Sequence, residues 1–204
     1  VLERALKALT VYHFHPESGK LNYSRGLALV GLGRDKEAYD AFRKSAWMKD
    51  TLSEAMTRAA MLDCKKGDWV NAKMCADTAV ENGAQNLTAR VLAAAARYKL
   101  GFKECAVKAL REELKRDPLN HMARYFLVVM GEMDKDTFYK KMYSNMSQTC
   151  LDLATDMMDA GFTAEAKELL CDVAKYSDDI CPVVAYLAGV PERANDKHKV
   201  FPFR

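Results

Sequence analysis

The sequence predicts an all-α fold, a right-handed α–α superhelix built from antiparallel helix pairs. Three glycines, Gly33, Gly67 and Gly101, follow one another at intervals of 34 residues. In step with them, a small residue stands seven positions before each glycine and an alanine five positions after it: Gly26, Ala60 and Ala94, then Ala38, Ala72 and Ala106. A self-similar period of this length is typical of a helix–turn–helix unit that buries its apolar face by stacking on its neighbours.

Each recurring residue has a structural role in the predicted unit. Two antiparallel helices approach closely where one of them presents almost no side chain. The small residues before each glycine are therefore expected to face the alanines after it. The glycines are expected to end the first helix of each pair, because the residue after the last turn often takes a left-handed conformation.

The chain before the first repeat, residues 1–18, is expected to hold the last helix of a truncated preceding unit, followed by a loop. Apolar residues at helical spacing predict that helix over residues 1–12: Leu2, Ala5, Leu6 and Leu9. The loop contains His13 and His15. Two ligands leave a zinc site half built, so we expect the histidines to lie at the rim of the loop and predict no metal site.

Three repeat units follow, over residues 19–52, 53–86 and 87–120. Their expected helices are residues 21–32 and 35–48, residues 53–66 and 69–82, and residues 87–100 and 103–116. The alanine-rich first helices contribute little volume to the core. The second helices are expected to supply it through Tyr39, Phe42, Leu110 and Leu114.

The period breaks after Pro118, since the next glycine of the pattern, Gly161, comes 60 residues after Gly101. We interpret residues 121–146 as a helical insert with helices over residues 119–130 and 136–144. A helix face with aromatic and methionine side chains is expected to pack against the end of the solenoid. The alternative is that this face contacts a partner. That face comprises Phe138, Tyr139, Met142 and Tyr143.

A fourth unit with a short final helix is expected over residues 147–189, where Ala154, Gly161 and Ala166 have the internal spacing of the first three units. Its helices are expected over residues 148–160, 164–176 and 182–187. Residues 190–204 are expected to form an irregular tail. The apolar side chains in that tail suggest a chain cut before a further helix.

These residues resemble the tetratricopeptide repeat family. The small–glycine–alanine framework fits the family's pattern three times, and the third unit ends in Asp117-Pro118, as the family's units usually do. The bulky aromatic residue that the family favours early in the first helix is replaced by Asn22, Met56 and Arg90, and its usual tyrosine by Leu29, Asp63 and Arg97. The resemblance implies a divergent solenoid that binds protein partners.

Asp63 and Arg97 occupy one equivalent position in successive units, where the family usually buries an aromatic side chain. Stacking brings equivalent positions near each other, so the sequence predicts an ion pair between them. A catalytic role for the pair is the weaker alternative, since interfaces between repeats often contain polar pairs that set the register.

The resemblance also implies a concave wall made by fixed positions of each first helix. The residues expected to bind a partner there are Tyr23, Leu27, Arg58, Met61, Lys65, Tyr98 and Lys99. An apolar wall with a few cations suits an amphipathic helix or an extended peptide that carries some acid. The alternative is that a domain of the same protein or an adjacent helix fills the wall.

Composition narrows the classes of function. Lysine and arginine exceed aspartate and glutamate by only three, spread along the chain, which argues against a nucleic-acid partner. No apolar run approaches the roughly 20 residues of a membrane-spanning helix. No Gly-rich phosphate loop, H-E-x-x-H or G-x-S-x-G motif occurs. We therefore expect no catalytic residues, no cofactor, no nucleic-acid partner and no membrane span.

Six cysteines lie in predicted helices without C-x-x-C pairing. Cys105 and Cys171 stand next to or near packing alanines, so the cysteines are expected to act as small buried apolar residues rather than as metal or redox sites. Free thiols favour a reducing compartment, and we expect a cytoplasmic protein.

Two hypotheses for function remain. In the first, the chain is an interaction or scaffolding module whose groove binds a peptide or protein. The second rests on the order of the loop, the repeats and the terminal Val200-Phe201-Pro202-Phe203-Arg204, which resembles the C-terminal repeat region of large bacterial proteins with an N-terminal β-rich domain of unknown function. That resemblance implies a non-catalytic appendage packed on the carbohydrate-active domain of its own protein. The sequence predicts no oligomeric state.

Overall fold

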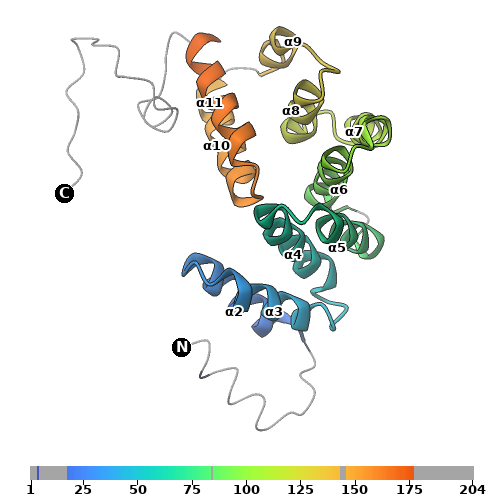
Figure 1. The fold of residues 1–204 in the computed structure, drawn as a ribbon, viewed down its shortest axis with the longest axis vertical. Helices are drawn as coiled ribbons and strands as arrows, with labels where there is room; N and C mark the ends of the chain where they lie inside the picture. The colour runs from blue at the N-terminus through green and yellow to red at the C-terminus, as the bar shows by residue number, and fades with distance from the viewer. Residues whose placement is uncertain (1–3, 5–17, 84, 143–145, 177–204) are drawn as a thin grey trace, which may run out of the picture.

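The computed structural model describes residue 4 and residues 18–83, 85–142 and 146–176, and every regular element in these ranges is a helix. The helices from α2 to α11 form antiparallel pairs that follow one another in a curved stack (Figure 1). The pairs are α2 (Lys20–Gly31) with α3 (Asp35–Ser45), α4 (Leu52–Lys66) with α5 (Trp69–Asn82), α6 (Leu87–Lys99) with α7 (Lys103–Arg116), α8 (His121–Val129) with α9 (Lys135–Lys140), and α10 (Met146–Asp159) with α11 (Thr163–Tyr176).

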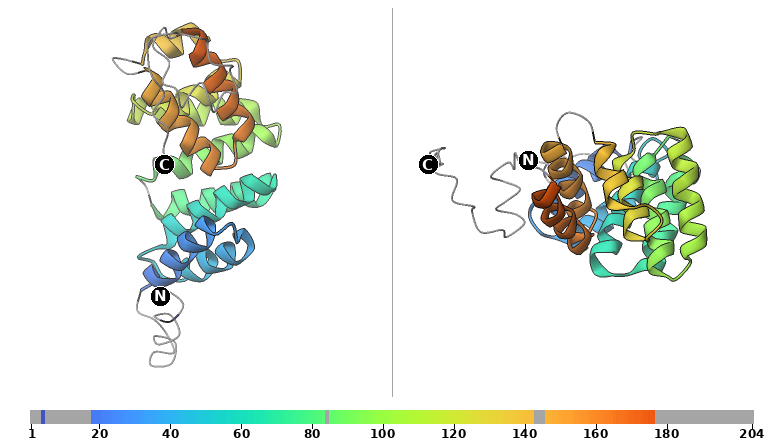
Figure 2. Two further views of the ribbon diagram at one scale, coloured as in Figure 1. Left: turned by 90° about the vertical axis from the view of Figure 1, so that its left-hand side faces the viewer. Right: turned by 90° about the horizontal axis from the view of Figure 1, so that it is seen from above.

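This arrangement confirms the expected fold class, an all-α solenoid of helix pairs. In the side view of Figure 2, helices α2 to α5 occupy the lower half of the molecule and the later pairs the upper half. The predictions for residues 1–17 and 177–204, including the truncated helix, the two loop histidines, the short helix and the tail, lie outside the described residues.

Each pair turns on a glycine with a left-handed backbone. The φ angles lie between 71° and 88° at Gly33, Gly67, Gly101, Gly131 and Gly161. In each turn the amide of the following residue donates to the carbonyl oxygen five residues back, as from Phe162 to Met157 at 2.8 Å. This hydrogen bond satisfies a carbonyl that the end of the first helix would otherwise leave unpaired.

The segment expected as an insert contains a helix pair of its own. Gly131 follows Gly101 by 30 residues and precedes Gly161 by 30, and it has the same left-handed turn as the others. The second helix of this pair, α9, is only six residues long. Its Phe138 and Tyr139 are 1% and 2% exposed, so they pack inside the fold, with the ring of Phe138 centred 5.4 Å from that of Tyr125. Tyr143 lies outside the described residues.

The small residues of the repeat pattern are all buried between their helices: Gly26, Ala38, Ala60, Ala72, Ala94, Ala106, Ala154 and Ala166. Phe42 and Leu110 are fully buried on the second helices, while Tyr39 and Leu114 pack against the core from partly buried positions. The paired helices approach each other closely at these positions. Their small side chains are therefore shielded from water.

Gly26 lies against the ring of Phe42. A Cβ built on Gly26 would stand 2.5 Å from ring atom Cε1, and the ring is fully buried. At the equivalent positions of the third unit stand Ala94 and Leu110. Gly26→Ala is therefore expected to lower the free energy of unfolding by about 1–3 kcal/mol, and to cost clearly less in a Phe42→Leu background.

Urea denaturation of the two single variants and the double variant measures this coupling. Equal effects of Gly26→Ala in both backgrounds would show that the ring does not set the size limit at this position.

Candidate functional site

The predicted wall is the set of seven residues expected to bind a partner, and the structure divides it into two parts. Tyr23 and Leu27 lie on α2, and Arg58, Met61 and Lys65 on α4. Tyr98 and Lys99 lie at the end of α6. The first part keeps some exposed apolar surface, whereas the α6 part meets the last helix pair of the same chain.

In the α2 and α4 part, the Tyr23 ring is half-buried and packs 5.7 Å from the ring of Phe42. Leu27 is 39% exposed. Met61 is half-buried, and the Arg58 guanidinium donates to its sulfur at 3.7 Å. Leu27 is thus the most accessible apolar residue of the predicted wall.

The α6 part of the predicted wall is engaged by α11. The Lys99 ammonium lies 2.5 Å from a carboxylate oxygen of Glu165 and 5.6 Å from the centroid of the Trp69 ring. The Glu165 side chain is 11% exposed. Tyr98 is partly buried against the core. The cation predicted to bind an acidic partner is therefore paired with an acid from its own chain.

The turn between α10 and α11 extends this contact to α4, α5 and α8. The Phe162 ring is 1% exposed, stacked 5.9 Å from Trp69 and packed edge-on 4.9 Å from Phe126. A Cβ built on Gly161 would stand 2.5 Å from the backbone nitrogen of Lys65. Figure 1 shows the turn beside the α4–α5 turn, although α6 to α9 separate the two in the sequence. We call this the closure contact.

The Tyr125 hydroxyl strengthens the closure contact from α8, donating to the Glu165 carbonyl oxygen at 3.0 Å. From α9, Lys135 pairs with Glu168 at 3.0 Å and with Asp172, both on α11. Burial is the main cause that raises the pKa of the Tyr125 hydroxyl, so it stays a neutral donor at physiological pH. Helix α11 is therefore held by apolar, neutral and ionic contacts to several earlier units.

Helix α10 places a carboxyl group near Arg58, the one arginine of the predicted wall. Partial burial and the neighbouring Asp159 and Asp152 raise the pKa of the Asp156 carboxyl, while the Arg58 guanidinium acts in the opposite direction. Lys65 lies 3.9 Å from Asp35 at the start of α3. All three cations of the predicted wall thus have acidic groups of the same chain nearby, which weakens their attraction for an acidic partner.

The overall arrangement matches a solved structure. The chain superposes on a tetratricopeptide repeat protein from Parabacteroides merdae ATCC 43184 with a TM-score of 0.55 and 15% sequence identity, over 92% of this chain and 77% of the other. The fold is that of a tetratricopeptide repeat protein. No protein-family model matches the sequence, and no curated protein matches it.

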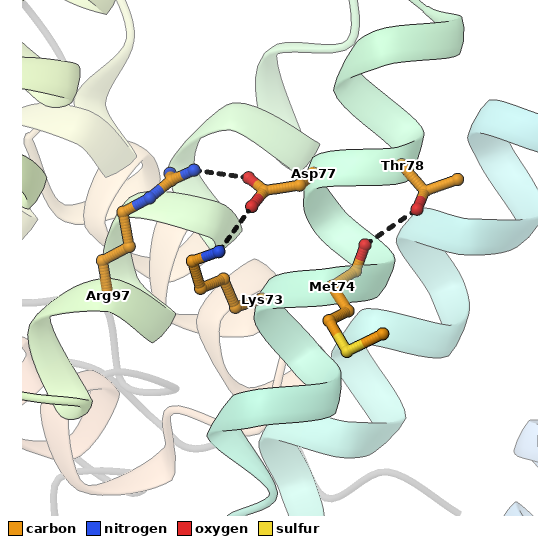
Figure 3. A network of polar contacts seen from close by, with 5 residues as sticks. All are labelled: Lys73, Met74, Asp77, Thr78 and Arg97. Carbon is orange, nitrogen blue, oxygen red and sulfur yellow. Dashed lines mark hydrogen bonds and ion pairs between the residues drawn. The ribbon is translucent and has the colours of Figure 1, made fainter.

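The ion pair between repeats exists in this tetratricopeptide-like stack, but its acid differs from the one predicted. Arg97 pairs with Asp77 of α5 at 2.5 Å, and Lys73 joins the same carboxylate at 3.0 Å (Figure 3). The prediction of an Asp63–Arg97 pair is wrong. Equivalent positions on stacked first helices lie near each other, but the long arginine side chain reaches the second helix of the preceding unit instead.

Asp63 is buried next to a thiol and a phenol. It is 3% exposed and accepts a hydrogen bond from the Cys75 thiol at 3.6 Å, and the Tyr39 hydroxyl lies 3.9 Å from the same sulfur. Burial raises the pKa of the Asp63 carboxyl, and the hydrogen bond from Cys75 opposes this shift in part. Among the residues that the structure describes, no cation forms an ion pair with Asp63, and a buried carboxylate without such a pair is costly when ionised.

The raised pKa predicts a pH-dependent effect of Asp63→Asn. The folded state holds the Asp63 proton more tightly than the unfolded state, so stability from that proton is present below the ordinary aspartate pKa of about 3.9 and is lost as pH rises through the folded value. The variant lacks this loss. The difference in free energy of unfolding, variant minus unsubstituted chain, is therefore expected to increase from pH 4 upward. The increase is at most about 1.4 kcal/mol per pH unit, and the difference then levels off.

Urea titrations at several pH values measure that difference. A difference that stays constant with pH, or that falls as pH rises, would contradict the burial account of Asp63.

The cysteines do not all behave as expected. Cys64, Cys75 and Cys150 are buried, but Cys105 is exposed and Cys171 is intermediate. The expectation of burial is wrong for Cys105, because its side chain is rotated by about 100° around α7 from that of the packing Ala106 and reaches solvent. Within residues 18–83, 85–142 and 146–176, no group of three or more histidine, cysteine or carboxylate side chains is arranged to hold a metal ion.

No helix in the described part of the chain combines the length and the apolar character needed to cross a membrane. The sequence did not indicate four residues of the closure contact: Trp69, Phe126, Phe162 and Glu165. Gly161 was identified as a repeat position, but nothing in the local sequence indicates that its turn meets α4.

Proposed function

We propose that this chain is a non-catalytic interaction module that binds a protein segment on the α2 and α4 part of the predicted wall. The observation that carries the proposal is Leu27, a large apolar side chain 39% exposed on α2. Tyr23 of α2 and Met61 of α4 extend its apolar surface at half-buried positions. A tetratricopeptide-like fold supplies a rigid stack of helices on which such a surface is held in a fixed shape.

The charges nearby favour an apolar partner over an acidic one. Lys99 is paired with Glu165, Lys65 lies near Asp35, and Arg58 lies near the Asp156 carboxyl. An acidic peptide would compete with these groups for each cation. We therefore infer that the partner is an amphipathic helix that places its apolar face on Leu27, Tyr23 and Met61.

A second candidate is that the partner belongs to the same protein, so that the chain is a structural or regulatory appendage packed on another domain. The same exposed residue, Leu27, supports this candidate, because a docking domain needs the same apolar contacts as a separate partner. The two candidates share the binding surface and differ in whether the partner is covalently linked.

A peptide-display selection on the purified chain tests the surface. Selected peptides are expected to form amphipathic helices, and Leu27→Asp is expected to weaken their binding at least about tenfold, since a buried unpaired carboxylate replaces an apolar contact. Leu119→Asp is the matched control, because Leu119 is 68% exposed and lies outside the predicted wall.

Three results would contradict the proposal: no enriched peptides, equal effects of Leu27→Asp and Leu119→Asp, or enrichment of acidic peptides without an apolar face. If the chain is part of a longer protein, binding of another domain of that protein to the purified chain, lost with Leu27→Asp, would favour the appendage.

A further inference from the structure

Phe162, the residue just before α11, and the first turn of α11 contact the rest of the chain in the way that a bound segment contacts a receptor. Phe162 inserts a fully buried ring between Trp69 and Phe126. Three residues later, the Glu165 carboxylate meets the Lys99 ammonium at 2.5 Å. Phe162 stacks on the Trp69 ring and Glu165 pairs with Lys99, whose ammonium lies over that ring, so both anchors contact the same surface.

The receptor side of this contact comes from three different pairs. Trp69 begins α5, Lys99 ends α6, and Phe126 lies in α8. The Lys99 ammonium also lies over the Trp69 ring, 5.6 Å from its centroid, so one side chain contacts both the aromatic pocket and the carboxylate. An aromatic anchor in a desolvated pocket beside a charged pair is the arrangement that dominates the energetics of many protein interfaces.

The two anchor residues, Phe162 and Glu165, therefore indicate which side chains a ligand of this surface carries. We propose that the surface formed by Trp69, Lys99 and Phe126 recognises helical segments with an aromatic residue just before the helix and, three residues later in its first turn, a carboxylate, and that a partner segment of this kind binds by replacing α11. This inference goes beyond the proposed function, which concerns α2 and α4, and does not depend on it.

Helix α11 competes with a partner helix for this surface, so it lowers the apparent affinity of the chain for that partner. A tethered segment acts at an effective concentration in the millimolar range, so a free helix binds the unsubstituted chain only in the fraction of molecules whose α11 has left the surface. Weakening the anchors of α11 raises that fraction. Binding of a free helix is therefore expected to improve when Phe162 or Glu165 of the chain is changed.

Trp69 provides the measurement. The chain contains two tryptophans, Trp47 and Trp69, and Trp47 is 79% exposed, so Trp47→Phe leaves Trp69 as the single tryptophan, which can be excited selectively. The probe is a synthetic peptide that copies residues 159–173, with Cys171→Ser to prevent oxidation. The control peptide has the same sequence with Phe162→Ala and Glu165→Gln.

The probe is titrated into the full 204-residue chain, all variants carrying Trp47→Phe. Relative to the chain with its own anchors, the chain with Phe162→Ala and Glu165→Gln is expected to bind the probe at least about tenfold more tightly. Adding Lys99→Glu is expected to weaken that binding at least about tenfold, and the control peptide is expected not to bind. Circular dichroism establishes which variants are folded.

The single variant Glu165→Gln keeps the aromatic anchor Phe162. It replaces the double variant in the titration if the double variant does not fold. It is expected to bind the probe more tightly than the unsubstituted chain. The proposal is wrong if the folded variants do not bind the probe, if they bind it no more tightly than the unsubstituted chain does, or if Lys99→Glu leaves binding unchanged.

Discussion

Phe162→Ala is expected to lower the free energy of unfolding by about 3–5 kcal/mol, the largest effect of any single alanine substitution proposed for this chain. The ring is 1% exposed and contacts Trp69 and Phe126, so its removal leaves a cavity where α11 meets the earlier units. The matched control is Phe102→Ala. Phe102 also follows a turn glycine, but it is 57% exposed, and its loss is expected to change stability by no more than about 0.5 kcal/mol.

Urea denaturation monitored by circular dichroism measures both effects. Since both phenylalanines follow a turn glycine with a left-handed backbone, the difference between the two variants reports the closure contact. Two effects of similar size would mean that Phe162 contributes no more than an exposed turn residue does.

Gly161→Ala is expected to be more destabilising than Gly101→Ala, although both glycines have nearly the same backbone, with φ of 87° and 88°. Each substitution places a Cβ in the left-handed region, at a cost of about 1–2 kcal/mol. At Gly101 the new Cβ would meet nothing within 4 Å, whereas at Gly161 it would stand 2.5 Å from the Lys65 nitrogen and 2.7 Å from its Cα. Backbone cannot rotate away as a side chain can.

The additional cost at Gly161 is expected to be about 1–3 kcal/mol, because the α10–α11 turn has to withdraw from α4. The same denaturation experiment compares the two variants. If both lose the same stability, the close approach of the two backbones does not exist in solution.

The 34-residue period predicted the first three units because every element of the pattern has a packing reason. The fourth pair escaped this prediction. At seven before and five after Gly131 stand Arg124 and Asp136 instead of small residues. With α9 only six residues long, the pair has no long helix crossing that would require them. A search for glycine alone at intervals near 30 would have found the turn.

The closure contact escaped prediction for a different reason. Phe102 and Phe162 have the same neighbour and the same turn, yet one is exposed and the other fully buried. What distinguishes them is that the α10–α11 turn meets α4 and α5, through contacts between residues about 100 positions apart in sequence. Arg97 shows the same limit at shorter range. Its position predicted an inter-repeat ion pair, and only the packed structure shows that its partner is Asp77.

The contact between Trp69 and Phe162 is the most direct test of this account, since their ring centroids lie 5.9 Å apart only if the α10–α11 turn lies on the α4–α5 turn. In the Trp47→Phe background, a NOESY spectrum with the Phe162 ring assigned through Phe162→Leu is expected to show cross peaks between the indole and Phe162 ring protons. Absence of those cross peaks, with Trp69 shifts unchanged by Phe162→Leu, would show that α11 does not close on the earlier helices.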